Sequence, residues 1–101
     1  MNIREIADVL GFDIEDVQMV VEVFKEEAHI QMNLLHSAIK THNFASIVSA
    51  SHAIKGSASN LHLDIISKSA REIEMSARDE KHIDYQAEYN TISIELDTLK
   101  L

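Results

Sequence analysis

The sequence predicts an all-α fold, an antiparallel up-down four-helix bundle with a short additional helix at the N-terminus. Apolar residues recur every three or four positions through most of the chain, which is the spacing of a helix with one buried face. The 101 residues include only two glycines and no proline, so residues that break helices are almost absent. Aromatic residues make up only 5% of the chain, and this aliphatic composition suits packing between helices better than a sandwich or barrel.

The sequence of the first half of the chain predicts one short helix and one long helix. A helix is expected over about residues 2–10, and Gly11 follows it at the position where a left-handed residue ends a helix. Asp13 is the predicted N-cap of a long helix that runs to about Lys40. Its buried stripe is predicted to comprise Val17, Val21, Phe24, Ala28, Leu35 and Ala38, supported by Val20, Met32 and Ile39.

Three further helices are expected in the second half. Asn43 caps one over about residues 44–61, Asp64 or a neighbour caps one that runs to about Lys81, and the last begins near Asp84. Short links between long amphipathic helices make neighbours antiparallel, and no linker or repeat divides the chain. Residues 1–101 are therefore expected to form a single helical domain.

Composition excludes several classes of function. The formal net charge of −8 repels a phosphate backbone, so nucleic acid is not an expected partner. No apolar run approaches the roughly 18 residues of a membrane span, and two glycines cannot build a phosphate-binding loop for ATP. The absence of cysteine suits a reducing compartment, so we expect a cytoplasmic protein, and Met1 with the short first helix favours a free-standing one.

One stretch of the third helix departs from this pattern. Gly56 stands in mid-helix, where it costs roughly 1 kcal/mol relative to alanine. At about 100° per residue, His52 lies about 115° from the centre of the buried side, at the edge of the bundle. Gly56 shares that edge, Ser59 lies near it, and Lys55 falls on the flank of the buried arc, from which its ammonium group can reach outward.

This arrangement suits phosphoryl transfer. An exposed imidazole is a nucleophile whose neutral form is common near neutral pH. Gly56 would leave the ring uncovered for a partner, Lys55 would supply positive charge for the phosphoryl group, and Ser59 offers a further hydrogen-bond donor. A phosphoryl acceptor needs mainly position and electrostatics, and no acid-base constellation of a self-contained hydrolase accompanies it.

The stretch from His52 to Ser57, His-Ala-Ile-Lys-Gly-Ser, resembles the signature of histidine-containing phosphotransfer (HPt) domains, and Leu61 fits the apolar position that follows. The resemblance covers essentially the whole chain in length, helix order and the place of the histidine. Where that family often has glycine after the apolar residue, this chain has His62. This departure concerns the geometry of the next turn.

The resemblance implies a phosphorelay intermediate. His52 would reversibly accept a phosphoryl group from the aspartyl phosphate of a receiver domain and pass it to another receiver aspartate. Lys55 would be the electrostatic helper, Gly56 the clearance position and Nε2 the attacking atom. Partners would be response-regulator receiver domains or a hybrid histidine kinase, and the Mg²⁺ of the reaction would belong to the receiver. This phosphoprotein would be no enzyme with its own kinase machinery, would hold no cofactor or metal, and is expected to be a monomer.

Two other hypotheses about the function stay open. A helical bundle could bind receivers or other partners without transferring phosphate. Glu26 and His29 have the spacing found in di-iron bundles, and Asp79 and His82 repeat it, although the further inward carboxylates of such a site are missing. Gly56 could also serve a close helix crossing, and Lys55 and Ser59 could be ordinary surface residues.

Overall fold

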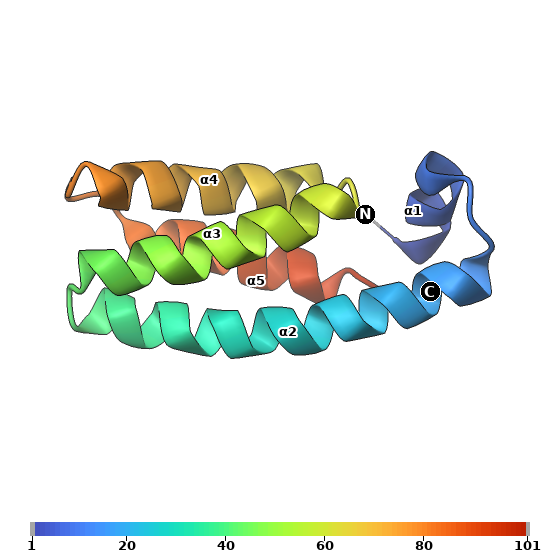
Figure 1. Ribbon diagram of the computed structural model, residues 1–101, viewed down its shortest axis with the longest axis horizontal. Helices are drawn as coiled ribbons and strands as arrows, with labels where there is room; N and C mark the ends of the chain where they lie inside the picture. Colours follow the sequence, from blue (N-terminus) through green and yellow to red (C-terminus); the bar gives the residue numbers. More distant parts are fainter. Residues whose placement is uncertain (1, 101) are drawn as a thin grey trace.

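Within residues 2–100, four helices form an elongated antiparallel bundle, and a short N-terminal helix lies at one end (Figure 1). The computed structural model describes residues 2–100. The helices in this range are α1 (Ile3–Leu10), α2 (Ile14–Lys40), α3 (Phe44–Asn60), α4 (Asp64–Arg78) and α5 (Tyr85–Asp97). The predicted up-down bundle with a short N-terminal helix is confirmed. None of the helices in the described range is long and apolar enough to cross a membrane.

The long helix α2 extends well beyond the ends of its neighbours (Figure 1). It has 27 residues, whereas α3 has 17, and the molecule measures 41 × 19 × 18 Å. The extension is covered by α1 and by the C-terminal segment, whose Lys100 carbonyl accepts a hydrogen bond from the backbone N–H of Ile3 at 3.5 Å. Lys25 donates to the Leu99 carbonyl at 3.2 Å, so both chain ends are attached to this half of α2.

The predicted helix ends are largely confirmed. Gly11 has a left-handed φ of 71°, the Asn43 side chain accepts from the N–H of Ser46, and the Asp84 side chain accepts from the N–H of Ala87. Asp13 occupies the N-cap of α2 without a side-chain hydrogen bond, and Leu63 is the N-cap of α4.

The end of α4 differs from the prediction. The helix ends at Arg78, and not near Lys81. Glu80 takes a left-handed φ of 53°, and the N–H of Lys81 turns back to the Ser76 carbonyl at 2.9 Å. This backbone arrangement closes a helix, and a non-glycine residue in it leaves little signal in the sequence.

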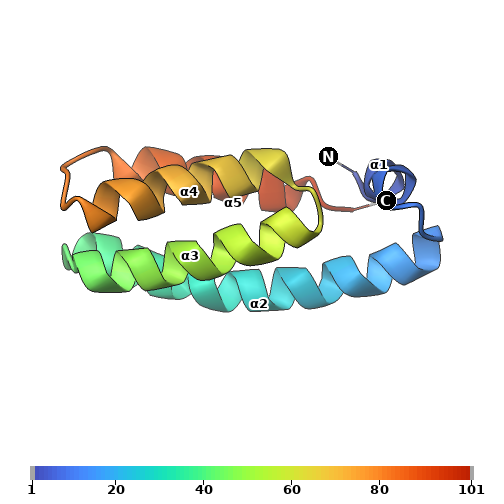
Figure 2. The ribbon, with the colours of Figure 1, turned by 45° about the horizontal axis from the view of Figure 1, so that its top comes forward.

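The core is mainly aliphatic and runs along the bundle. It includes Val17, Leu35, Ile47, Ile54, Ile73 and Ile92, all at most 1% exposed. Val20, which was predicted to support the buried stripe of the long helix, is instead 48% exposed. Helix α3 lies between α2 and α4, with α5 on the other side of the bundle (Figures 1 and 2). One edge of α3 therefore meets α2 and the other meets α4.

Candidate functional site

His52 lies on the exposed edge of α3 that meets α4. Its neighbours Ser51 and Ile54 are buried at 0% and 1% exposure and hold this turn of the helix against the core. The Ser51 hydroxyl donates to the Ile47 carbonyl at 2.6 Å, so the polar residue next to His52 is satisfied inside the helix. The His52 side chain is 61% exposed, as the helical wheel predicted for an edge position.

A buried carboxylate on α4 holds the imidazole of His52. Nδ1 lies 2.9 Å from Oε2 of Glu74, a residue that is only 3% exposed. Burial of a charged carboxylate is costly unless cations and hydrogen bonds compensate it. Lys55 places Nζ 2.7 Å from Oε1, and Arg78 donates to Oε2 from Nη2 at 2.8 Å and from Nε at 3.2 Å. Glu74 is thus the centre of a four-residue cluster that joins α3 to α4.

The cluster keeps Glu74 ionised. Burial by itself raises the pKa of this carboxyl. The hydrogen bonds from Lys55 and Arg78, and then the bond from His52, outweigh burial and lower the pKa to about 2. With a neutral imidazole, the charges of Lys55, Arg78 and Glu74 sum to +1. The surroundings of His52 are therefore cationic in a chain whose formal net charge is −8.

The ionised carboxylate also determines which ring nitrogen of His52 carries the proton. Glu74 Oε2 can only accept, so Nδ1 of His52 donates to it. The neutral ring then has its lone pair on Nε2, the nitrogen remote from Glu74. Because the side chain is 61% exposed, Nε2 is the nucleophilic atom that a partner can reach. This geometry agrees with Nε2 as the expected attacking atom.

Gly56 leaves open space one turn after His52. A Cβ built on Gly56 would have no heavy atom within 4 Å, apart from its own helix backbone and chain neighbours. The residue has no left-handed φ, so neither backbone conformation nor a close helix crossing requires glycine here. Of the two interpretations of Gly56, the geometry supports clearance above the helix.

Lys55 and Ser59 are both attached to α4. The Lys55 side chain is 29% exposed and lies on the flank of the buried arc, paired with Glu74. The Ser59 hydroxyl shares a 2.7 Å hydrogen bond with that of Ser67. Ser59 therefore links α3 to α4. This contact satisfies the Ser59 hydroxyl within the chain, so no partner protein is needed for it.

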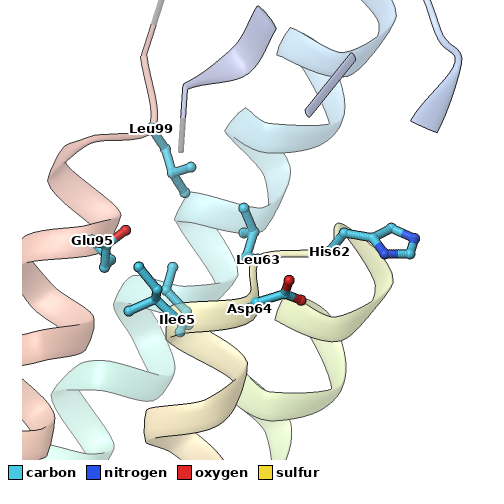
Figure 3. A pocket seen from close by; sticks show the side chains of 7 residues that line it. His62, Leu63, Asp64, Ile65, Glu95 and Leu99 are labelled. Atoms are coloured by element: carbon cyan, nitrogen blue, oxygen red, sulfur yellow. The ribbon is translucent and has the colours of Figure 1, made fainter. Parts of the chain in front are cut away.

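His62 takes up the geometry that glycine would take. Its φ is 56°, in the left-handed region, and the N–H of Leu63 bonds to the Ala58 carbonyl at 3.0 Å to close α3. Figure 3 shows that its ring projects away from a hollow of about 220 Å³ that Ile65, Glu95 and Leu99 help to line. The substitution thus preserves the turn, at the cost of a left-handed conformation for a residue with a Cβ.

Glu74 and Arg78 are the site residues that sequence reasoning missed. A signal for Glu74 was present, because it stands four residues after Ala70 and next to Ile73, beside the apolar stripe of α4. Arg78 follows Glu74 by four residues, which is the spacing of an ion pair on one helix.

The alternative di-iron pattern receives no support from side-chain placement. Within residues 2–100, no group of three or more His, Cys, Asp or Glu side chains is arranged to hold a metal ion. Glu26 and His29 are exposed on α2, and Asp79 and His82 are exposed at the end of α4 and beyond.

Comparison with known families gives one match. The family model described as "Hpt domain" matches residues 19–100, which includes the whole His52–Glu74 cluster. Searches of curated proteins and of solved structures found no match.

Proposed function

The chain belongs to the family of histidine-containing phosphotransfer (Hpt) domains, and we propose that it is a phosphorelay intermediate whose phosphoryl acceptor is His52. Hpt domains are phosphotransfer modules of two-component phosphorelays and interact with receiver domains and histidine kinases. The observation that carries the assignment to His52 is its hydrogen bond to Glu74. The imidazole is exposed, and its Nδ1 donates a hydrogen bond to an ionised carboxylate.

In the proposed forward step, the Nε2 lone pair of His52 attacks the phosphorus of an aspartyl phosphate on the receiver. The N–P bond forms as the P–O bond to the aspartate breaks, and the electron pair leaves with the receiver carboxylate. The ring becomes an N-phosphoimidazolium that keeps its Nδ1 proton, so no proton has to be transferred. Glu74 at 2.9 Å stabilises the positive ring by charge and hydrogen bonding.

The reverse step follows the same atoms. A receiver aspartate attacks phosphorus, the N–P bond breaks and its electron pair returns to Nε2. Lys55 and Arg78 are fixed on Glu74 beside the ring, where they make the potential favourable for phosphoryl oxygens in both directions. Gly56 keeps the approach to Nε2 open.

The proposal assigns the Mg²⁺ of the reaction to the receiver. The carboxylate hydrogen-bonded to the ring, Glu74, is already paired with two cations and with Nδ1. That donor set disfavours a divalent cation at this position. The chain would then contribute a nucleophile, a cationic environment and clearance, with no cofactor of its own.

A labelling experiment tests the proposal. A receiver domain phosphorylated with radiolabelled acetyl phosphate is incubated with the wild-type chain, with His52→Gln and with His29→Gln, which replaces an exposed histidine on α2. We expect acid-labile, alkali-stable label on the wild type and on His29→Gln, and none on His52→Gln. Receiver binding without label on the wild type would instead support a docking bundle that transfers no phosphate.

A further inference from the structure

Arg71 is an exposed cation on the edge of α4 that meets α3. Ser67 and Glu74 mark this edge, since each is hydrogen-bonded to a side chain of α3. Going around α4 at about 100° per residue, Arg71 lies about 40° beyond Ser67, on the side turned away from the core. The two helices lie side by side along the bundle (Figures 1 and 2). Arg71 is therefore at the outer rim of the contact between them, as is the exposed ring of His52.

The antiparallel register places Arg71 about one helical turn from the level of His52. Ser59 on α3 is hydrogen-bonded to Ser67 on α4. Seven residues earlier on α3 and seven residues later on α4, His52 is hydrogen-bonded to Glu74. Arg71 precedes Glu74 by three residues, so it is displaced from His52 by about 4.5 Å along the bundle, at 1.5 Å per residue. An extended arginine side chain can span that displacement.

The surface of α3 between Arg71 and His52 is open. In the same register, Lys55 and Gly56 are the α3 residues at the level of Arg71. Lys55 is turned toward Glu74, with Nζ 2.7 Å from Oε1. Gly56 has no side chain, and a Cβ on it would meet open space. The guanidinium of Arg71 can therefore extend over Gly56 toward a group carried on Nε2 of His52.

The guanidinium of Arg71 is not engaged by the chain itself. Among residues 2–100, no side chain or carbonyl forms a hydrogen bond or ion pair with it. Glu74 stands three residues later, a spacing at which ion pairs form on a helix. However, Lys55 is bound to one oxygen of Glu74 and Arg78 to the other. The N–H groups of the Arg71 guanidinium thus remain available to a ligand.

A phosphoryl group on Nε2 of His52 would be a suitable ligand for Arg71. Such a group carries negative charge and several acceptor oxygens. Lys55 and Arg78 are bound to Glu74, which holds Nδ1, so both cations are attached on the opposite side of the ring from Nε2. Arginine is suited to the remaining role, because its planar fork can bind two phosphoryl oxygens through parallel hydrogen bonds.

We propose that Arg71 binds the phosphoryl group carried by His52 and stabilises the phosphorylated form of the chain. This inference rests on the function proposed above and adds a phosphoryl-binding residue to it. Arg71 forms no covalent bond in the reaction. It shifts the transfer equilibrium toward the phosphorylated chain, because it binds this form in preference to the unphosphorylated one.

A titration of the phosphorylated chain tests the contact without any receiver. Phosphoramidate transfers its phosphoryl group to the histidine and releases ammonia. The phosphorus-31 resonance that is absent from His52→Gln is then followed from alkaline to neutral pH in the wild type, Arg71→Ala and Arg71→Lys. Lys68→Ala is the control, because Lys68 is an exposed cation of α4 that lies one turn further from His52 and about 60° further around the helix from the α3 edge.

Contact with the guanidinium favours the doubly charged phosphoryl group, so its resonance should titrate at higher pH in Arg71→Ala than in the wild type. Arg71→Lys should restore part of this difference, since lysine keeps the charge without the paired donors. Lys68→Ala should titrate with the wild type. A titration of Arg71→Ala that coincides with the wild type would overturn the inference, as would an equally large shift in Lys68→Ala.

The transfer equilibrium separates this inference from the proposed function. With a phosphorylated receiver, Arg71→Ala should lower the equilibrium ratio of phosphorylated to unphosphorylated chain about fivefold to tenfold, and Lys68→Ala should leave it unchanged. Failure of the proposed function would appear as absence of transfer to the wild type, while the titration still reports on Arg71. Failure of this inference would leave wild-type transfer intact and give Arg71→Ala the same equilibrium ratio as Lys68→Ala.

Discussion

The low pKa of Glu74 makes part of the stability of the bundle dependent on pH. The carboxyl has an ordinary pKa of 4.5 and a folded pKa of about 2. A depressed folded pKa contributes stability above pH 4.5, and this contribution is lost as pH falls toward 2. The difference between these two pKa values corresponds to about 3 kcal/mol of stability at pH 7. Linkage leaves about 1 kcal/mol of this contribution at pH 3, so about 2 kcal/mol is lost between pH 7 and pH 3.

The perturbation that isolates this contribution is Glu74→Gln. Glutamine keeps a similar shape and an oxygen that can accept from Nδ1 of His52, but it has no titratable charge. Urea unfolding followed by far-ultraviolet circular dichroism gives the free energy of unfolding of both proteins at pH 7, 5 and 3. The wild type should exceed the variant most at pH 7, and the difference should shrink by about 2 kcal/mol at pH 3.

The informative quantity is the difference in free energy of unfolding between the wild type and Glu74→Gln, because the other carboxylates titrate in both proteins. Glu72→Gln, at an exposed position on the same helix, serves as control and should differ little from the wild type at any of these pH values. A wild-type advantage over Glu74→Gln that stays constant from pH 7 to pH 3 would refute the reasoning that Glu74 is a buried anion held by Lys55, Arg78 and His52.

Four substitutions test the site and the turn that ends α3. Gly56→Ala should raise the free energy of unfolding by up to about 1 kcal/mol in urea titrations, because the added Cβ meets no atom and alanine favours helix. Gly56→Leu should also fold, yet slow receiver transfer by crowding His52, and an unchanged transfer rate would contradict the clearance role. His62→Gly should stabilise the fold by about 0.5–1 kcal/mol in thermal unfolding, since glycine adopts a φ of 56° without strain. A loss of stability would show that the contacts of the His62 side chain matter more than the backbone strain of the turn. Lys55→Ala should reduce the transfer rate on the order of tenfold, while circular dichroism shows an unchanged helix content. A Lys55→Ala variant that transfers phosphate at the wild-type rate would remove Lys55 from the mechanism.

Much of the fold is encoded in local patterns. The spacing of apolar residues along α2 and α3 predicted both helices within a residue or two at each end, and Asn43 and Asp84 marked helix starts that their hydrogen bonds confirm. These features depend on residues within one or two turns of each other, and their periodicity is visible in a single sequence. The end of α4 was predicted three residues too late, because it depends on a left-handed backbone at Glu80.

The exposed edge position of His52 was also a local property, since Ser51 and Ile54 face the core and the helix repeat then turns His52 outward. The open space above Gly56 follows from the same repeat. Which side chain would contact the imidazole was not a local property. Glu74 is 22 residues away on another helix, and its distance from Nδ1 depends on the axial shift and rotation of α4 against α3.

The helices, their order and the outward-facing histidine can be predicted from local sequence, because each depends on a repeat of 3.6 residues and on nearby capping groups. The burial of Glu74, its contacts with Lys55 and Arg78 and its hydrogen bond to Nδ1 of His52 arise from the packing of α3 against α4. This packing brings the two helices into one register, in which a carboxylate removed from water is favourable because its partners are in place.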